Sequence, residues 1–238
     1  MTKRILPLVI LLLLAATTHA ADRAQVADSL TWYGQSTFHT AVFGPSIYFD
    51  PINLPAGTPP ADIIMISHSH KDHLSSDALK KISTDKTVII APGDCKSKLK
   101  WVDKAEFISL APGESKDISG LHIEAVPAYN RTKTKFHPKS NKWAGYVVSS
   151  AGVSIYHAGD TERLDEMQAI DCDIALLPLG QTYTMKSVQD AADAAMDTKA
   201  EIAIPMHYGT GEGSQADAAM FAELLTGRIE VRVMQPAK

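Results

Sequence analysis

The chain of 238 residues is 45% hydrophobic and 21% charged, with a formal net charge of -4. These proportions are typical of a globular fold, and the length fits one α/β domain without repeats or low-complexity tracts. The mildly acidic balance disfavours nucleic acid as the main partner, because phosphate binding needs a basic face.

The first 20 residues are typical of a secretory signal peptide. Lys3 and Arg4 precede an apolar run from Ile5 to Ala16, and small residues follow up to Ala20. The run is shorter than the roughly 20 residues that span a bilayer, although an uncleaved anchor is the alternative. We expect cleavage near Ala20, export to the periplasm or the medium without a stable membrane anchor, and one domain over residues 21–238.

Short β-rich runs at residues 29–33, 37–42 and 46–49 predict a strand meander, and the continuous apolar run 62–67 predicts a strand buried on both faces. A helix is expected from Ser75 to Ile82. Further strands are expected at 87–90, 106–110, 121–125, 144–149, 153–157, 173–178, 201–205 and 229–234, and further helices at 94–99, 187–196 and 215–225. This order indicates two sheets with helices outside.

The strongest chemical signal is the block His68-Ser69-His70-Lys71-Asp72-His73, which directly follows the buried run 62–67. Imidazole nitrogens and carboxylate oxygens are good ligands for zinc and similar divalent ions. In a tight turn His68 and His70 can point one way, and Asp72 and His73 toward a neighbouring position. The block therefore predicts two adjacent metal sites, against the alternative of a solvated polar turn.

Two later segments also place polar residues at the ends of predicted strands. Asp160 follows Gly159, which permits close backbone approach, and its carboxylate could bridge two metals or cap a helix. His207 follows the strand 201–205 and is a candidate for a further ligand, with a structural role as the alternative. Such strand ends are where an α/β scaffold exposes its functional loops.

In this order, the HxHxDH block, Gly159-Asp160-Thr161 and Met206-His207-Tyr208-Gly209 resemble the metallo-β-lactamase superfamily. Other segments are similar to the branch of metal-dependent hydrolases akin to ascorbate-6-phosphate lactonase: 31–34, 48–51, 126–130, 137–139 and 181–185. The resemblance implies a single-domain αββα sandwich with one or two divalent ions, zinc in the first place and manganese or iron as alternatives. It places His68 and His70 on one metal, Asp72, His73 and His207 on the second, and Asp160 between them.

Three positions depart from the family pattern. Relatives usually carry a histidine ligand where this chain has Asn130, so either Asn130 or the nearby His137 is expected to contact the metal or the substrate. Gln35 stands where relatives often have a histidine, and Gln181 where they often have a glycine. The number of metal ions therefore depends on which residue completes the first position.

Several further residues are candidates for supporting roles. Asp50, which ends an early strand, resembles a residue behind the ligands, although a simple turn before Pro51 explains it equally well. His157 is a candidate for the same kind of role because it lies close to Asp160. Tyr183, Thr184 or Tyr208 could donate a hydrogen bond to a developing oxyanion.

A basic loop surrounds His137 and is either a contact for an anionic substrate or simply solvated. It contains Arg131, Lys133, Lys135, Lys139 and Lys142. Cys95 and Cys172 could form a disulfide in an exported protein, or could be two separate buried residues.

The function expected from these features is metal-dependent hydrolysis. A metal-bound hydroxide, oriented by Asp72 or Asp160, would attack an ester, lactone, amide or phosphodiester bond of a small molecule, with an anionic substrate as one alternative. The alternatives are a phosphodiesterase or nuclease of the same fold and a non-catalytic metal-binding protein. No oligomeric state follows from the sequence.

Overall fold

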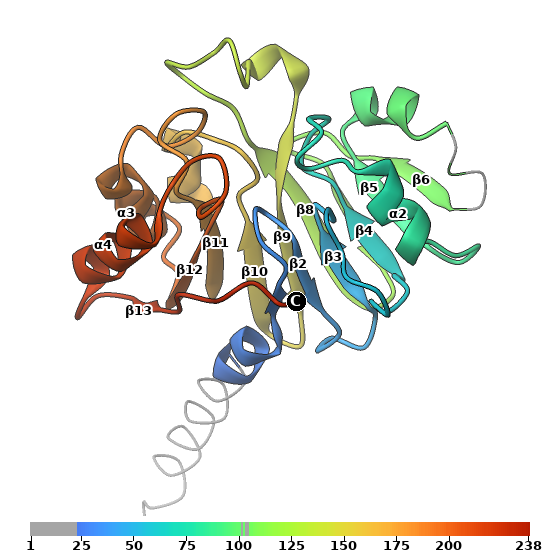
Figure 1. The fold of residues 1–238 in the computed structure, drawn as a ribbon, viewed down its shortest axis with the longest axis horizontal. Helices are drawn as coiled ribbons and strands as arrows, with labels where there is room; N and C mark the ends of the chain where they lie inside the picture. Colours follow the sequence, from blue (N-terminus) through green and yellow to red (C-terminus); the bar gives the residue numbers. More distant parts are fainter. Residues whose placement is uncertain (1–22, 101, 103–104) are drawn as a thin grey trace, which may run out of the picture.

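Two β-sheets packed face to face form the centre of the molecule, and helices cover their outer faces (Figure 1). The structure, a computed structural model, describes residues 23–100, 102 and 105–238. The signal peptide predicted at residues 1–20 lies outside this part of the chain. Within it, no helix is both long and apolar enough to cross a membrane.

The first sheet has the strand order β1-β2-β3-β4-β5-β6. Its strands are β1 (Thr31–Trp32), β2 (Phe38–Thr40), β3 (Ile47–Phe49), β4 (Ile63–Met65), β5 (Val88–Ala91) and β6 (Glu106–Ser109). The first three strands are antiparallel, and β3 to β6 are parallel. Every residue of β4 and β5 is buried, as expected for parallel strands that are covered on both faces.

The second sheet has the order β13-β12-β11-β10-β9-β8-β7. Its strands are β7 (Ser115–Ile118), β8 (Leu121–Pro127), β9 (Ala144–Ser150), β10 (Val153–His157), β11 (Ile174–Pro178), β12 (Ile202–Met206) and β13 (Glu230–Val231). Strands β10 to β13 are parallel and β7 to β10 are antiparallel. Strand β8 alternates buried and exposed residues over Leu121–Glu124, so one face packs on the core while the other meets solvent.

The helices are placed by local capping and by apolar faces. Helix α2 (Ser76–Ile82) packs Leu79 and Ile82 into a buried cluster with residues of β4 and β5 on the outer face of the first sheet. Helices α3 (Val188–Asp197) and α4 (Gln215–Leu225) contact each other beside the second sheet. Short 3-10 helices lie at η1 (Gly93–Lys98), η2 (Lys139–Asn141) and η3 (Asp165–Ala169).

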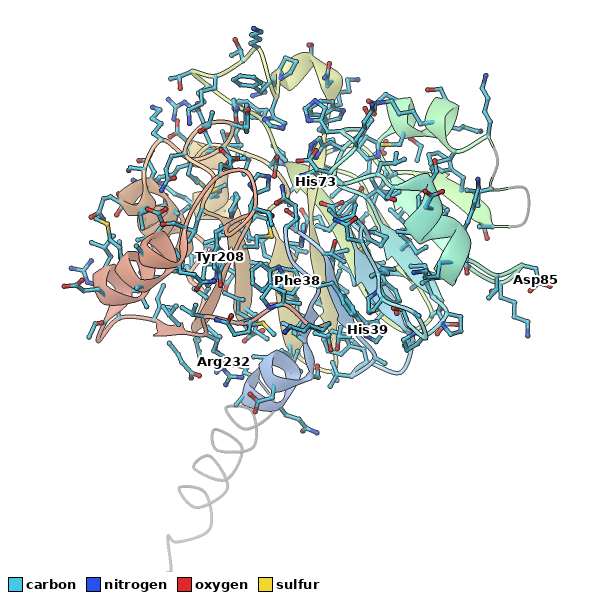
Figure 2. The ribbon with its side chains drawn as sticks, viewed as in Figure 1. Phe38, His39, His73, Asp85, Tyr208 and Arg232 are labelled. Carbon is cyan, nitrogen blue, oxygen red and sulfur yellow. The ribbon has the colours of Figure 1, made fainter. Side chains whose placement is uncertain are left out.

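The core between the two sheets is built from large side chains such as Phe38, which Figure 2 labels near the middle of the sandwich. His73 lies near one edge in the same view and His39 near the opposite edge. Cys95 and Cys172 are buried in different hydrophobic clusters and are both free thiols. The open question of a disulfide is therefore answered by two separate buried residues.

The predicted αββα architecture is confirmed, with three local differences. Residues 23–29 are helical, so Ser29 ends a helix where a strand was expected. Strand β7 was missed because it is an edge strand whose first three residues are exposed, which leaves no apolar pattern. The last strand is only Glu230–Val231 because the chain beyond it follows an irregular path.

Candidate metal centre

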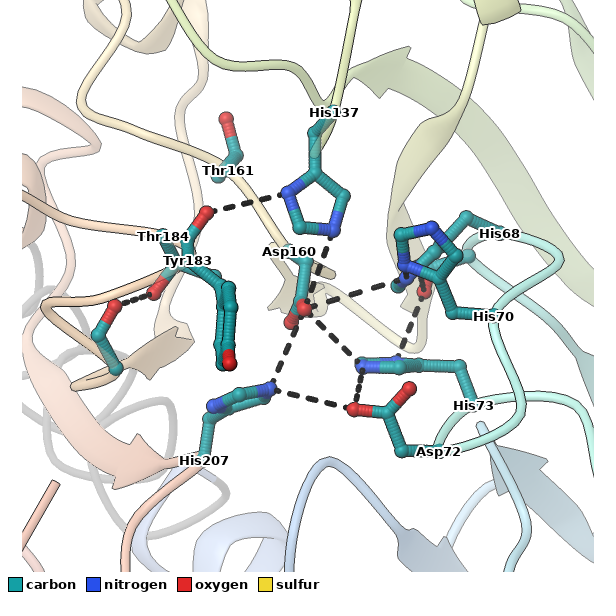
Figure 3. Close-up of polar contacts among 12 residues, drawn as sticks. His68, His70, Asp72, His73, His137, Asp160, Thr161, Tyr183, Thr184 and His207 are labelled. Carbon is teal, nitrogen blue, oxygen red and sulfur yellow. Dashed lines mark hydrogen bonds and ion pairs between the residues drawn. The ribbon is translucent and has the colours of Figure 1, made fainter. Parts of the chain in front are cut away.

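Seven side chains from four loops converge at the edge of the sandwich where β4, β8, β10 and β12 end (Figure 3). The donor atoms form two groups, each with all its atoms within 4.8 Å of one another. The first group is His68, His70 and His137, and the second is Asp72, His73, Asp160 and His207. The sequence prediction placed five of these residues in the same two groups and Asp160 between them. Of its two candidates for completing the first group, the structure brings His137 there.

Asp160 lies at the centre of this arrangement (Figure 3). Its Oδ2 is 3.2 Å from His207 Nε2, 3.3 Å from His73 Nε2 and 3.4 Å from His137 Nε2. His68 Nε2 is 4.0 Å away. One carboxylate oxygen therefore faces imidazoles of both groups, which is the geometry a bridging ligand requires.

A tight turn sets the directions of the HxHxDH side chains. The amides of His73 and Leu74 both donate to the carbonyl of His70, at 3.1 and 2.8 Å. This turn leaves His68 Nε2 3.0 Å from His70 Nδ1, and it brings Asp72 Oδ2 to 3.8 Å from His73 Nε2. The first two side chains therefore face one position and the last two face its neighbour.

Glycine at position 159 lets the Asp160 loop approach this turn. Gly159 has a φ of 63°, and a Cβ there would lie 2.8 Å from the Cβ of Ser67, which precedes the HxHxDH block. Any larger residue would push the two loops apart. The close approach anticipated from the sequence is thus between the two ligand-bearing loops.

Hydrogen bonds from behind fix how the imidazoles face the centre. His73 Nδ1 is 2.7 Å from Asp50 Oδ2, and His137 Nδ1 is 3.2 Å from the carbonyl of Tyr183. The Asp50 carboxylate takes the proton of His73 Nδ1, which leaves the Nε2 lone pair of that ring for a metal. The Tyr183 carbonyl offers His137 the same arrangement, although Asn130 Nδ2 also lies 3.3 Å from His137 Nδ1.

The donor atoms fit divalent cations. His73 Nε2, His137 Nε2 and Asp160 Oδ1 are buried, yet among the described residues none of these atoms has a hydrogen-bond partner. Buried polar atoms are otherwise nearly always paired, so their convergence on one space indicates an ion. Imidazole nitrogen with carboxylate oxygen is the donor set of zinc and related metals.

The charges of the second group point the same way. Burial alone would lower the pKa of His207, but the carboxylates of Asp160 and Glu212 raise it to about 10. Burial would also lower the pKa of His73, yet Asp160 and Asp50 raise it well above its ordinary value. The protonated rings of His207 and His73 therefore balance the charge of the buried carboxylates in the metal-free protein. A divalent cation would supply that positive charge instead and displace the two protons.

The first group has the opposite character. Burial, reinforced by the neighbouring imidazole of His73, lowers the pKa of His68 well below its ordinary value. Burial and His137 lower the pKa of His70 as well. These two rings are therefore neutral near pH 7, the form in which imidazole binds a metal. The indole of Trp143 packs against both rings, at 4.8 Å between centroids.

The choice between Asn130 and His137 is resolved by the loop that joins them. The amide of Asn130 donates to the carbonyl of His137 at 2.7 Å, and its Nδ2 donates to the carbonyls of Tyr183 and Lys133. His137 then reaches the first group, while Asn130 holds the loop from behind. Its buried Oδ1 is unpaired among the described residues.

Asp50 and His157 lie behind the donor groups. Asp50 is fully buried and accepts hydrogen bonds from the amide and hydroxyl of Ser67 as well as from His73, so it does more than turn the chain. The ring of His157 bonds the carbonyl of Ser36 and the amide of Gly159. It therefore supports the backbone next to Asp160 rather than a ligand side chain.

Of the three candidates for an oxyanion donor, the structure leaves one at the site. The Thr184 hydroxyl donates to the carbonyl of Gly180, and the Tyr208 hydroxyl donates to the carbonyl of Met234. Both groups are buried and engaged in holding the chain together, so their predicted role is wrong. Tyr183 is 42% exposed, and its ring lies to one side of Asp160, next to His207 (Figure 3).

The basic loop around His137 is used mainly for internal contacts. Arg131 pairs with Asp165, and Lys139 pairs with Glu166. Lys133 Nζ donates to the carbonyls of Gln181, Thr184 and Met185, which ties this loop to the one that carries Tyr183. Arg131, Lys133 and Lys139 are thus engaged within the protein, which differs both from a contact for an anionic substrate and from a simply solvated loop.

Glu162 anchors the same loop from the segment that carries Asp160. Its carboxylate accepts hydrogen bonds from the amides of Arg131, Thr132 and Lys133, at 2.9 to 3.0 Å, and from the Thr132 hydroxyl. The side chain is buried in this nest of donors. The path of the chain toward His137 therefore depends on Glu162.

Replacing Glu162 by Gln should lower the free energy of unfolding by about 2 kcal/mol near neutral pH, since charge-assisted hydrogen bonds are lost. Burial alone would raise the pKa of Glu162, but the donors of Thr132 and its neighbours lower it below 4.5. A depressed pKa adds stability above the unfolded value that is lost as the pH falls below it. Denaturant titration should therefore show a smaller difference in free energy of unfolding between parent and variant below about pH 4 than near pH 7. An equal difference at both pH values would contradict this role.

Two residues of the site were not singled out from the sequence. Trp143 packs on the first group, and Glu212 Oε1 lies 3.1 Å from His207 Nδ1. A charged residue between Gly211 and Gly213, in a loop that follows a strand-end histidine, is a signal that could have identified Glu212. Trp143 gives no comparable pattern.

Three non-glycine residues of the site have a left-handed backbone: Gln35 at φ 50°, Asp50 at 42° and His207 at 59°. Such conformations are uncommon outside glycine and persist only when surrounding contacts hold them. The His207 amide donates to the Gln35 carbonyl at 2.9 Å, and the Gln35 side chain contacts His207 Nε2 at 2.7 Å. The strained segments thus support one another at the second group.

Two hollows of about 490 and 270 Å³ open onto the donor groups, and Asp72 and Tyr183 line both. The larger is walled by Tyr33, Gly34, Gln35, Ile52, Asn53, His207, Thr210, Gly211, Glu212 and Pro236. The smaller adds His70, Phe136, His137 and Asp160. No described lysine or arginine lines either hollow.

Comparison with known proteins gives consistent results. The profile of the β-lactamase superfamily domain matches residues 29–207. A UPF0173 metal-dependent hydrolase of Opitutus terrae is 31% identical over 224 residues, covering 88% of this chain and 97% of the relative. Another from Thermoplasma acidophilum is 35% identical, covering 74% and 77% of the two chains.

Solved structures agree with this assignment. A metal-dependent hydrolase candidate from Parabacteroides distasonis is 35% identical with a TM-score of 0.76, covering 87% of this chain and 93% of its own. A metallo hydrolase from Ignicoccus hospitalis is 26% identical with a TM-score of 0.72, covering 88% and 95%. The narrower resemblance to ascorbate-6-phosphate lactonases stays a prediction. The chain belongs to the β-lactamase superfamily, as a metal-dependent hydrolase of the UPF0173 family.

Proposed function

We propose that this protein hydrolyses a small, uncharged ester or lactone with two divalent cations, zinc in the first place. The observation that supports this proposal is the convergence of seven ligand side chains on two adjacent positions, with Asp160 Oδ2 between them. Three of their buried atoms, His73 Nε2, His137 Nε2 and Asp160 Oδ1, have no hydrogen-bond partner among the described residues. His68, His70 and His137 would hold one ion, Asp72, His73 and His207 the other, and Asp160 would contact both.

When bound, such cations lower the pKa of a coordinated water from about 15.7 toward about 7 and polarise the bond under attack. The chain's own residues orient the reactants around this centre. Asp72 is half-exposed, and its Oδ2 faces both His73 and His207, so it can hold a water and accept its proton. The exposed phenol of Tyr183 lies beside the centre and lines both hollows, where it can donate a hydrogen bond to the substrate oxygen that gains charge.

The walls of the hollows support an uncharged substrate. Tyr33, Ile52 and Pro236 offer apolar surface, and Gln35, Asn53 and Thr210 offer neutral polar groups. The charged groups of the walls are the donor residues and the acidic Glu212. A phosphate or carboxylate away from the scissile bond would therefore find no described cationic side chain to pair with.

A matched pair of substrates tests this proposal. An uncharged lactone or aryl ester should be turned over with a kcat/KM at least about tenfold above that of its carboxylated analogue, a ratio worth about 1.4 kcal/mol. Elemental analysis should find two metal ions per chain, and a chelator should abolish turnover until metal is restored. Preference for bis-p-nitrophenyl phosphate would favour a phosphodiesterase instead, and tight metal binding without turnover of any probe would favour a non-catalytic protein.

We also propose that the protein acts outside the cytoplasm. The N-terminal sequence supports export, which would place the enzyme in the periplasm or the medium with a small molecule as its partner.

A further inference from the structure

Glu212 joins two loops of the site through its two carboxylate oxygens. It lies in the loop after β12, and its side chain is only 5% exposed. Oε2 accepts the amides of Thr182 and Tyr183 at 2.9 and 3.0 Å, and Oε1 lies 3.1 Å from His207 Nδ1. One buried charge thus contacts both a candidate metal ligand and the Tyr183 loop, which lines the two hollows beside the centre.

We propose that Glu212 is a positioning residue that holds His207 in its metal-binding tautomer and fixes the Tyr183 loop beside the metal centre. A carboxylate at this distance favours the tautomer of His207 with its proton on Nδ1, whose Nε2 lone pair faces Asp160 and Asp72 at 3.2 and 3.9 Å. The Gln35 amide nitrogen lies 2.7 Å from the same Nε2, where it would donate to that lone pair in the absence of a metal. This inference rests on the proposed function only in that His207 must bind a metal ion.

The contacts require a hydrogen-bond acceptor at both ends of the side chain. The two backbone amides can only donate, and the metal-binding tautomer of His207 also donates from Nδ1. In Glu212→Gln the side chain has an acceptor, the amide oxygen, at one end and a donor, the NH2 group, at the other. The amide oxygen would stay with the backbone amides of Thr182 and Tyr183. The NH2 group would then face His207 Nδ1 and favour the tautomer whose proton sits on Nε2.

Gly180 leaves room for this carboxylate. A Cβ at position 180 would lie 1.9 Å from Glu212 Oε1 and 2.7 Å from His207 Nδ1. Gly180 does not have a positive φ, so its backbone would accept alanine. A Gly180→Ala substitution therefore displaces Glu212, and the ring of His207 with it, without changing the chemistry of the carboxylate. It serves mainly to test the role of Glu212 toward the Tyr183 loop.

Two measurements on the full chain separate the two roles. Metal affinity reports on the role toward His207, and backbone amide hydrogen exchange reports on the role toward the Tyr183 loop. In Glu212→Gln, zinc affinity measured against a chromophoric chelator should fall about 10- to 100-fold, while hydrogen exchange at Thr182 and Tyr183 in the metal-free protein changes little. In Gly180→Ala, affinity should fall and exchange at both amides should rise. The control Glu166→Gln, at a partly exposed carboxylate bonded to Tyr129, should leave both readouts unchanged.

Parental zinc affinity in Glu212→Gln would overturn the role in holding His207. Parental exchange at Thr182 and Tyr183 in Gly180→Ala would overturn the role in holding the loop. If the parent protein itself bound no metal, the proposed function and the role toward His207 would fail together. The exchange measurement would still decide the role toward the Tyr183 loop.

Discussion

Asp160→Asn is expected to lose both metal ions and to lower hydrolysis by more than about 10³-fold, since the cations supply the reactive water at neutral pH. Burial alone would raise the pKa of Asp160, but the positive charges of His207 and His73 lower it well below its ordinary value. The carboxylate is therefore charged at neutral pH and is the main negative charge between the two groups. Asparagine keeps the shape and removes that charge. Elemental analysis and turnover of the uncharged ester measure the two effects.

The control for this variant is Asp165→Asn on η3, where the carboxylate is 83% exposed and pairs with Arg131. A surface pair of this kind contributes at most about 1 kcal/mol, so metal content and turnover should stay at parental values. Circular dichroism would show that the Asp160 variant keeps its secondary structure. Two retained metal ions in a folded Asp160→Asn protein would show that this carboxylate does not bridge the groups.

Most of the fold could be predicted because the buried strands are continuous apolar runs. Strands β4, β5, β11 and β12 are buried at every residue, and the sequence pattern marks each of them. The edge strand β7 could not be found in this way, because its exposed residues Ser115, Lys116 and Asp117 carry no hydrophobic period. Hydrophobic pattern predicts burial, and an edge strand that is barely buried escapes it.

The candidate ligands could be predicted because they lie at the ends of those same strands. His68, Asp160 and His207 follow β4, β10 and β12, whose carboxyl ends meet at one edge of the sandwich. Their positions follow from topology, and the type of side chain then specifies the chemistry. No long-range packing had to be known for this step.

The direction of each loop side chain could not be predicted. Thr184 and Tyr208 lie at strand ends like the ligands, yet their hydroxyls point to the backbone carbonyls of Gly180 and Met234. The choice of His137 over Asn130 depends on how the loop folds back on itself through the Asn130 amide. Sequence position places a residue near the site, whereas contacts between distant loops decide which atom faces it.

Asp50→Asn is expected to weaken metal binding about 10- to 100-fold and to lower the free energy of unfolding of the metal-free chain by about 3 kcal/mol. Asp50 accepts hydrogen bonds from the Ser67 amide, the Ser67 hydroxyl and His73 Nδ1, at 2.7, 2.6 and 2.7 Å. Asparagine can satisfy only part of this set, and its NH2 group would face a donor. Competition with a chelator and denaturant titration measure the two effects.

Asparagine is the informative replacement because the backbone at position 50 has a φ of 42°. Both Asp and Asn tolerate this left-handed conformation, so the substitution changes hydrogen bonding without adding backbone strain. The matched control is Asp62→Asn at the other end of β4, where the carboxylate accepts the Ser46 amide in an exposed position. Because Asp62 does not contact an imidazole, its variant should lose little stability and no metal affinity. Equal behaviour of the two variants would mean that Asp50 only turns the chain before Pro51, whereas the expected difference would establish that the buried carboxylate orients His73 toward the metal.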